Sequence, residues 1–316
     1  MPTIEIAAKE FMLACRADGL APTTLRWYRH MIRPFAAEFY NKQLDQLTAS
    51  QMRDYVARLR ERPDRYVRAA QRPQIAGGLS HESLRDHLRA LRRFFNWAWA
   101  EYNLEANKNP MLKLRMPGRE RKEPKAISLE DLGALLAACD DSQAGKRDRA
   151  MITLLADTGC RLGGLLTLKK QNLYLNDGYA VVTEKGNRDR AVPFIRSTAE
   201  VVAAWLEVRP YEAGDYVFCA LGAGHFGNPL TSSGLHMVLR RLKKSAGVSG
   251  RVNPHSFRHG FARQYLANGG DLATLAQLMG HSDVSVTVGF YAVFKDRELA
   301  KVHEKFSPMR KMGGRR

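Results

Sequence analysis

Apolar residues recur at helical spacing through the first third of the chain. From residue 4 to about residue 110, apolar positions follow one another at intervals of three and four, and polar turns separate the segments. In segment 80–102, Ser80 is a candidate helix N-cap, and an apolar stripe follows it, made of Leu84, Leu88, Leu91 and Phe95. No run here alternates as a strand does, and the prolines and paired glycines of 61–78 predict a long loop. The pattern predicts a helical domain over residues 1–112.

The pattern changes after residue 112. Segment 113–126 lacks an apolar face and holds two prolines, one glycine and six basic residues, which is typical of an interdomain linker. Helical spacing returns over 127–141 and 147–160. Short β-rich runs then occupy 172–194, separated by Asn-Asp-Gly and Lys-Gly-Asn turns, and they predict a small antiparallel sheet of about three strands. Helical spacing follows, so we expect a mainly α chain with a small antiparallel sheet in a second domain over 127–295.

Charge points to a polyanionic partner. The 316 residues include 50 Lys plus Arg against 32 Asp plus Glu, for a net charge of +18, which is more than solubility requires. The four cysteines are far apart and form no Cys-x-x-Cys pair, which argues against zinc and against a disulfide framework. No apolar run approaches the roughly 20 residues of a membrane span, and the acidic start does not resemble a signal peptide. We therefore expect a cytoplasmic protein that binds nucleic acid rather than a membrane.

Residues able to act on a phosphate are spread through the second half in a suggestive order. Arg161 follows a glycine-containing turn in 158–168, and a lysine lies in the β-turn of 183–193. The remaining candidates are His255, Arg258, His281 and Tyr291. Each has an ordinary alternative: a solvated turn lysine, a surface arginine, or a histidine or tyrosine satisfied in a core. The set in this order is more specific than any member.

Together these motifs resemble the tyrosine site-specific recombinases of the phage integrase family. The resemblance covers the chain and implies a two-domain DNA clamp: a helical core-binding domain, a basic linker, a catalytic domain and a C-terminal helix with a basic tail over 296–316. It implies cleavage and rejoining of DNA strands through a covalent 3′-phosphotyrosine, with no metal or nucleotide cofactor. The implied partners are double-stranded DNA at the nucleoid, three further copies in a homotetramer on two synapsed sites, and in some members accessory proteins that bend DNA.

The chemistry explains these residue types. A planar guanidinium binds two phosphate oxygens and stays charged, so Arg161 and Arg258 are assigned as clamps on the scissile phosphate. By resemblance, His281 hydrogen-bonds the phosphate and His255 assists proton movement near the nucleophile, Tyr291.

The proton for the leaving oxygen has several candidate donors. Lys185 resembles the general acid that the family carries on a flexible hairpin, and Arg188 and Arg190 are close competitors for the role.

Two positions depart from the family pattern. An acidic residue commonly follows the first arginine by three positions, but this chain has Gly164 there, so an orienting hydrogen bond is either missing or supplied from elsewhere. The interval from His281 to Tyr291 is ten residues rather than the usual nine, and Gly289 could absorb the extra residue in an irregular turn.

Two basic groups outside the active-site motifs are candidate DNA contacts. They are Arg85, Arg89 and Arg92 on one helical face, and Arg119, Arg121 and Lys122 in the linker. A solvated basic face is the alternative for the helical group.

Three questions stay open at this stage. A type IB topoisomerase-like enzyme uses similar chemistry, and a non-catalytic DNA-binding protein could share the scaffold. A short apolar stripe near the C-terminus, Leu299, Val302 and Phe306, could dock on its own domain or, as the resemblance favours, on a neighbouring protomer.

Overall fold

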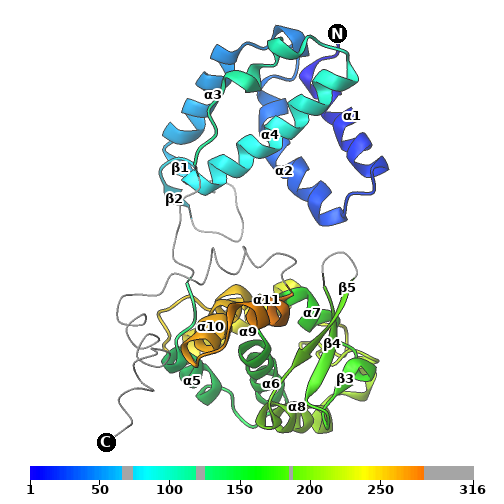
Figure 1. Ribbon diagram of the computed structural model, residues 1–316, viewed down its shortest axis with the longest axis vertical. Helices are drawn as coiled ribbons and strands as arrows, with labels where there is room; N and C mark the ends of the chain where they lie inside the picture. The colour runs from blue at the N-terminus through cyan, green and yellow to red at the C-terminus, as the bar shows by residue number, and fades with distance from the viewer. Residues whose placement is uncertain (66–73, 119–124, 185–187, 281–316) are drawn as a thin grey trace, which may run out of the picture. The chain divides into compact units, whose positions relative to one another are not determined.

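The computed structural model describes residues 1–65, 74–118, 125–184 and 188–280, and it divides the chain into two compact units, Met1–Lys122 and Glu123–Arg316 (Figure 1). The division falls within the segment 113–126. Several residues named above lie outside the described residues: Arg119, Arg121, Lys122, Lys185, His281, Gly289, Tyr291, Leu299, Val302 and Phe306, together with the side chain of Arg188.

The first unit is built from α-helices that begin at residues suited to capping. They are α1 (Ile4–Ala17), α2 (Pro22–Glu38), α3 (Ala49–Glu61) and α4 (His81–Glu101), with short 3-10 helices η1 (Leu44–Gln46), η2 (Ala106–Lys108) and η3 (Pro110–Lys113). Thr48 and Gln51 form a capping box before α3. Ser80 caps α4 by accepting a hydrogen bond from the Ser83 amide, as predicted.

Helix α4 supplies much of the first core. The four apolar residues predicted to form its stripe are all buried, and each is 2% exposed or less: Leu84, Leu88, Leu91 and Phe95. Helix α4 packs against α1 and α2, and edge-to-face ring contacts join Phe94 to Phe11 and Phe95 to Phe35. Leu114 also lies in this core, so the chain remains on the first unit just past η3.

The predicted loop over 61–78 contains a short strand pair that the sequence pattern did not indicate. Strand β1 (Asp64–Arg65) pairs antiparallel with β2 (Ile75–Ala76). Two residues per strand are too few to show an alternating pattern, which is why the prediction was incomplete.

The second unit packs helices around a small sheet. Its helices are α5 (Leu129–Ala137), α6 (Gln143–Thr158), α7 (Leu162–Thr167), α8 (Arg196–Val208), α9 (Ser232–Ser245), α10 (Pro254–Ala267) and α11 (Leu272–Met279), with 3-10 helices η4 (Lys170–Asn172) and η5 (Tyr211–Ala213). The strands β3 (Leu173–Tyr174), β4 (Tyr179–Glu184) and β5 (Arg188–Pro193) form one antiparallel sheet in the order β3-β4-β5. The mainly α fold with a small antiparallel sheet is confirmed.

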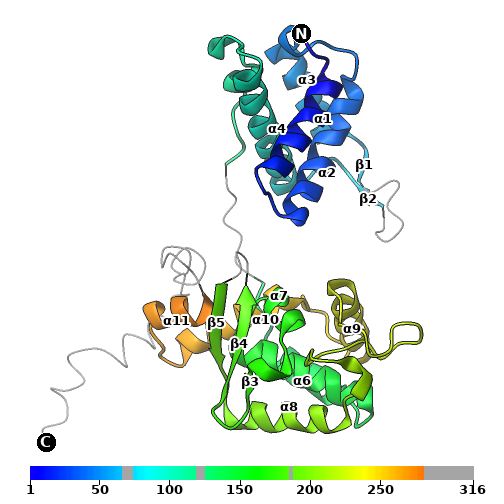
Figure 2. The same ribbon diagram turned by 90° about the vertical axis from the view of Figure 1, so that its right-hand side faces the viewer.

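Helix α6 is the central element of this unit. It packs against α8 and α10, and its Met151 and Leu155 are fully buried in a core that also takes Val182 of β4. In Figures 1 and 2, α7 and α8 lie at opposite ends of the sheet. The end of α6, the start of α7 and the first turn of α10 are therefore held by one core, and α11 packs on α10 through a second, smaller cluster of Ala262, Leu266, Leu275 and Met279.

A buried hydrogen bond joins two titratable groups in the first unit. The Tyr55 hydroxyl lies 2.8 Å from Nε2 of His87, and both side chains are buried. Burial, and then the charges of Arg62 and His30, lower the pKa of His87 from its ordinary 6.5 to about 4. The folded state therefore keeps this histidine neutral in a pH range where the unfolded chain protonates it.

This depression predicts acid sensitivity of the first unit. Because the folded pKa is the lower one, its contribution to stability is complete above pH 6.5 and is lost as the pH falls towards 4. Between pH 7 and pH 5 we expect protonation of His87 in the unfolded chain to lower the free energy of unfolding by about 2 kcal/mol. His87→Gln cannot titrate but can accept a hydrogen bond from Tyr55, so its free energy of unfolding should fall by about 2 kcal/mol less over the same pH range.

Denaturant titration followed by tryptophan fluorescence measures this difference, since Trp27, Trp97 and Trp99 report on the first unit. Equal losses of stability in the wild type and the variant would contradict it.

Candidate active site

Three arginines from different elements converge on the C-terminal end of α11. Arg190 of β5 donates to the Leu278 carbonyl, Arg258 of α10 donates to the Met279 carbonyl, and Arg161 donates to the Gly280 carbonyl at 3.2 Å. The last carbonyls of an α-helix have no partner within the helix, and this end carries the negative end of the helix dipole. Three successive carbonyls thus receive three guanidinium groups.

Gly280 allows this convergence. It ends α11 in the left-handed conformation, with φ of +63°. A Cβ atom at this position would lie 2.7 Å from Nε of Arg190 and 2.9 Å from Oε2 of Glu184. The residue is therefore restricted to glycine both by its backbone conformation and by the side chains packed against it.

Arg258 connects the ends of two helices. It lies in the second turn of α10 and is 5% exposed, and one Nη donates at 2.7 Å to the carbonyl of Gly159, the C-cap of α6. Its other Nη reaches the Met279 carbonyl. The guanidinium is thus held between two helix C-termini, where the dipoles favour a cation.

Arg161 lies at the N-cap of α7 and has a more open position. Its side chain is 36% exposed and forms an ion pair with Glu184 at the end of β4. Burial, and secondarily the charge of Arg190, lower the pKa of Arg161, but an arginine stays protonated at neutral pH. Arg161 therefore combines a fixed orientation with access to a ligand from solvent.

Glu184 is the site residue that sequence reasoning missed. Its side chain is 6% exposed and lies between Arg161 and Arg190, with Oε1 at 2.8 Å from an Nη of Arg190. The only signal in the sequence was its position two residues after Val182, since residues i and i+2 of a strand share a face. Arg190, predicted as a competitor of Lys185, uses its guanidinium for this ion pair and for the Leu278 carbonyl.

The structure gives a physical reason for Gly164. The glycine is buried, and a Cβ atom there would lie 3.0 Å from the Cβ of Val182. Helix α7 therefore approaches β4 closely at the position where the family pattern has an acidic side chain. The carboxylate that contacts Arg161 comes from Glu184 on β4 instead.

His255 lies in the first turn of α10, one turn before His259. The His255 residue is exposed, and loss of solvation of its ring, followed by the charges of Arg258, Arg251 and Arg161, lowers its pKa. Burial, then His255 and the nearby arginines, lower the pKa of His259 to about 4. Both rings are therefore neutral at neutral pH, and a neutral imidazole can accept a proton.

The predicted DNA contacts on α4 have partners within the first unit. Arg85 pairs with Glu82 at 3.7 Å and Arg89 with Asp86 at 3.0 Å. Arg92 donates to the carbonyl of Leu114 at 3.2 Å. Arg89 is the most exposed of the three, with 55% of its side chain accessible.

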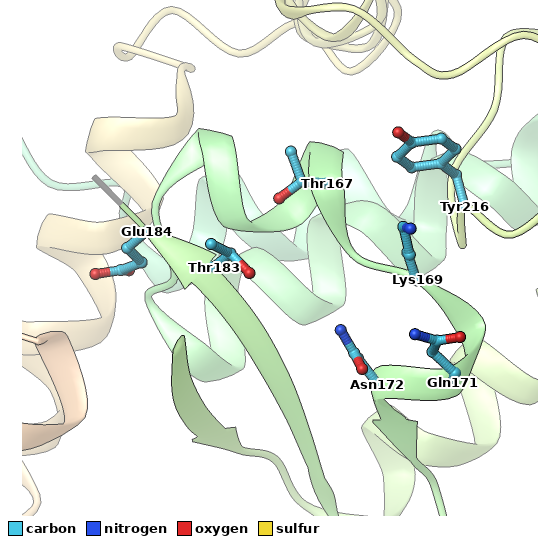
Figure 3. Close-up of a pocket in the computed structure, with 7 residues that line it drawn as sticks. All are labelled: Thr167, Lys169, Gln171, Asn172, Thr183, Glu184 and Tyr216. Atoms are coloured by element: carbon cyan, nitrogen blue, oxygen red, sulfur yellow. The ribbon is translucent and has the colours of Figure 1, made fainter. Parts of the chain in front are cut away.

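A polar pocket of about 480 Å³ lies beside the arginine cluster and is lined by Thr167, Lys169, Gln171, Asn172, Thr183, Glu184 and Tyr216 (Figure 3). In Figure 3 the Glu184 carboxylate points away from the other lining residues. The pocket and the arginine cluster thus lie on different sides of the end of β4. Among the residues that the structure describes, there is no cluster of His, Cys, Asp or Glu that could hold a metal ion, and no helix is long and apolar enough to cross a membrane.

Two family models match the chain. The phage integrase family matches residues 125–297, and the N-terminal SAM-like domain of phage integrases matches residues 8–102. The tyrosine recombinase XerD of Ralstonia nicotianae is 31% identical over 296 residues, covering 92% of this chain and 90% of that protein. The tyrosine recombinase XerC of Salmonella typhi is 30% identical, covering 93% and 92%.

Solved structures share the fold at low identity. The Tn1549 transposon integrase in complex with a circular intermediate DNA aligns with a TM-score of 0.75 at 17% identity, over 97% of this chain and all of that one. A lambda integrase dimer bound to a COC′ core site aligns with a TM-score of 0.70 at 18% identity, over 90% of this chain and 97% of the other.

The packing around Gly280 predicts the effect of adding a methyl group. Gly247→Ala should cost only the roughly 1–2 kcal/mol of a left-handed alanine. Gly280→Ala should cost at least about 1 kcal/mol more, because its added Cβ would also collide with Arg190 and Glu184. Gly247 is the matched control because it has a similar φ of +64° but no atom within 4 Å of an added Cβ. Thermal and denaturant unfolding measure both variants, and equal losses would show that Gly280 is not packed against the arginine cluster.

Proposed function

The chain belongs to the phage integrase family and is a site-specific tyrosine recombinase that cuts and rejoins DNA, and we propose the following division of labour among its residues. Arg161 and Arg258 clamp the non-bridging oxygens of the scissile phosphate, and Tyr291 attacks the phosphorus. The observation that carries this proposal is the convergence of both arginines on adjacent carbonyls at the end of α11.

The clamp assignment is supported by how the arginines are held. Arg258 is anchored by two carbonyls and Arg161 by one carbonyl and one carboxylate, so neither guanidinium needs to be ordered when DNA binds. Donors fixed in advance stabilise the charge of a phosphoryl transition state without reorganisation. His281 follows Gly280 directly in the sequence, and we assign it a hydrogen bond to the same phosphate.

The proton transfers accompany one bond made and one bond broken. The Tyr291 oxygen bonds to phosphorus, the bond from phosphorus to the 5′ oxygen breaks, and the 5′ oxygen takes a proton from Lys185. The phenolic proton passes towards His255, whose lowered pKa keeps it neutral and able to accept. Attack by the 5′-hydroxyl of another strand reverses these steps and rejoins DNA, so the reaction consumes no external energy source.

The two units are proposed to enclose the duplex. We assign residues 1–112 to a core-binding domain, 113–126 to a basic linker and 127–295 to the catalytic domain, with 296–316 as a C-terminal helix and tail. The net charge of +18 favours phosphate contacts from Arg85, Arg89 and Arg92 and, in the linker, from Arg119, Arg121 and Lys122. Of these, Arg89 has the greatest access to a duplex in the described α4 surface.

Assembly is the remaining part of the proposal. Four protomers bring two DNA sites together at the nucleoid in the cytoplasm, with accessory DNA-bending proteins where the site requires them. Segment 296–316 docks on a neighbouring protomer through Leu299, Val302 and Phe306, which couples the position of each nucleophile to its neighbour.

Replacing the nucleophile separates binding from chemistry. Tyr291→Phe should bind DNA as the wild type does and form no covalent adduct, since only the phenolic oxygen is removed. Trapping on a nicked suicide substrate followed by peptide mapping identifies the attached residue. An adduct mapped to any other tyrosine would refute the assignment, and the absence of an adduct with the wild type on cognate DNA would refute covalent catalysis.

The clamps should need guanidinium geometry as well as charge. Arg161→Lys should lower the single-turnover cleavage rate by well over tenfold, or about 1.4 kcal/mol, at unchanged DNA affinity, because a lysine cannot form a bidentate contact. Arg258→Lys should lower the cleavage rate by at least the same factor. Its melting temperature should be measured as well, because the substitution also affects two buried hydrogen bonds. Arg196→Lys, on the exposed Arg196–Glu200 pair, is the control. Rates within about threefold of wild type for both clamp variants would make these arginines structural.

Deletion of 296–316 tests the assembly. The truncated chain should bind one half-site normally and lose cooperative loading of the second half-site, because the docking helix is absent. Gel-shift titration on half and full sites measures both, with thermal melting as the folding control. Cooperativity equal to that of the full chain would show that the segment docks on its own domain.

A further inference from the structure

A buried carboxylate lies within the cationic cluster, and the division of labour proposed above gives it no role. The two oxygens of Glu184 contact two different arginines, Oε2 with Arg161 and Oε1 with Arg190. The side chain is 6% exposed, compared with 36% for Arg161. Glu184 is thus enclosed, and the arginine that it holds is accessible.

The carboxylate reaches Arg161 because α7 lies close to β4. Val182 and Glu184 share one face of β4, and the space beside Val182 is filled by the backbone at Gly164, where a Cβ would lie 3.0 Å from the valine Cβ. A side chain on α7 at position 164 therefore has no room. The next position on the same face of β4 belongs to Glu184, whose side chain meets Arg161 at the start of α7.

Charge explains why a carboxylate is needed there. Arg161 and Arg190 lie close enough that the charge of Arg190 lowers the pKa of Arg161, after the larger effect of burial. Apart from Glu184, both guanidinium groups bond to neutral carbonyls at the end of α11 in the part of the chain that the structure describes. Without an anion between them, like-charge repulsion would drive the more exposed of the two, Arg161, towards solvent.

We propose that Glu184 is a positioning residue of the recombinase site: its carboxylate, braced by Arg190, fixes the Arg161 guanidinium for the scissile phosphate. The proposal rests on the assignment of Arg161 as a clamp. Glu184 does not touch DNA in this role, and its effect on the reaction passes through Arg161. Arg190 contributes by holding the second oxygen of the carboxylate and by tying β5 to the Leu278 carbonyl.

The first test measures chemistry at saturating DNA. Glu184→Gln keeps the size of the side chain and removes its charge, and we expect it to slow single-turnover cleavage of a suicide substrate at least tenfold, with the dissociation constant for DNA within threefold of wild type. Glu200→Gln is the matched control because Glu200 pairs with Arg196 on the exposed surface of α8. A cleavage rate within threefold of wild type for Glu184→Gln would overturn the proposal.

A double-mutant cycle distinguishes positioning from general structural support. If Glu184 acts through Arg161, then Glu184→Gln should cost less than threefold in the background of Arg161→Lys, although it costs at least tenfold alone. An equal fold-loss in the two backgrounds would show that Glu184 acts independently of Arg161 and would overturn the proposal.

A measurement without catalysis keeps the inference separate from the proposed function. In the full chain labelled with ¹⁵N-arginine, the ion pair should restrict rotation of the Arg161 guanidinium and give separate Nη–H signals, assigned by their loss in Arg161→Lys. In Glu184→Gln these signals should merge. In the control variant Glu200→Gln, the signals of Arg196 should change and those of the other arginines should keep their positions. Unchanged Arg161 signals in Glu184→Gln would overturn the positioning role. If wild type formed no adduct with DNA while the signals merged as expected, the catalytic assignment would fail and the positioning of Arg161 by Glu184 would stand.

Discussion

The arrangement of the site depends on the unpaired carbonyls at the C-terminal end of α11. A helix end needs hydrogen-bond donors and favours cations, and here three arginines satisfy successive carbonyls from Leu278 to Gly280. Each arginine comes from a different element, so this helix end fixes the start of α7, the sheet and α10 relative to one another. The chain then leaves α11 through the left-handed Gly280 directly before His281.

Gathering cations in a partly buried place is unfavourable unless anions or dipoles oppose them. The α6 and α11 C-termini provide dipoles for Arg258, and Glu184 provides a full charge for Arg161 and Arg190. The cluster of three arginines and one glutamate retains a net positive charge, which suits a phosphodiester. Preorganised donors of this kind lower the barrier to phosphoryl transfer without reorganising during the reaction.

Sequence reasoning succeeded where a local pattern was sufficient. The α4 stripe follows helical spacing, and the sheet follows from turn residues between β-rich runs. Arg161 and Arg258, named from an ordered set of motifs, meet at one helix end, and their role as clamps stays a prediction. Glu184 was missed because its meaning depends on the packing of α7 against β4, which no local pattern encodes. The strand pair β1-β2 was missed because each strand is two residues long. Lys185, His281 and Tyr291 lie outside the described residues, and their roles remain predictions.

The central claim is that the arginine clamp is built before DNA arrives. A crystal structure of Tyr291→Phe bound to a DNA half-site tests it most directly, because the scissile phosphate stays intact in that variant. The account predicts that Arg161 and Arg258 each donate to a non-bridging oxygen of that phosphate, with Arg258 still bound to the Gly159 and Met279 carbonyls. A phosphate bound by other cations, or an Arg258 that has left both carbonyls to reach it, would contradict the account.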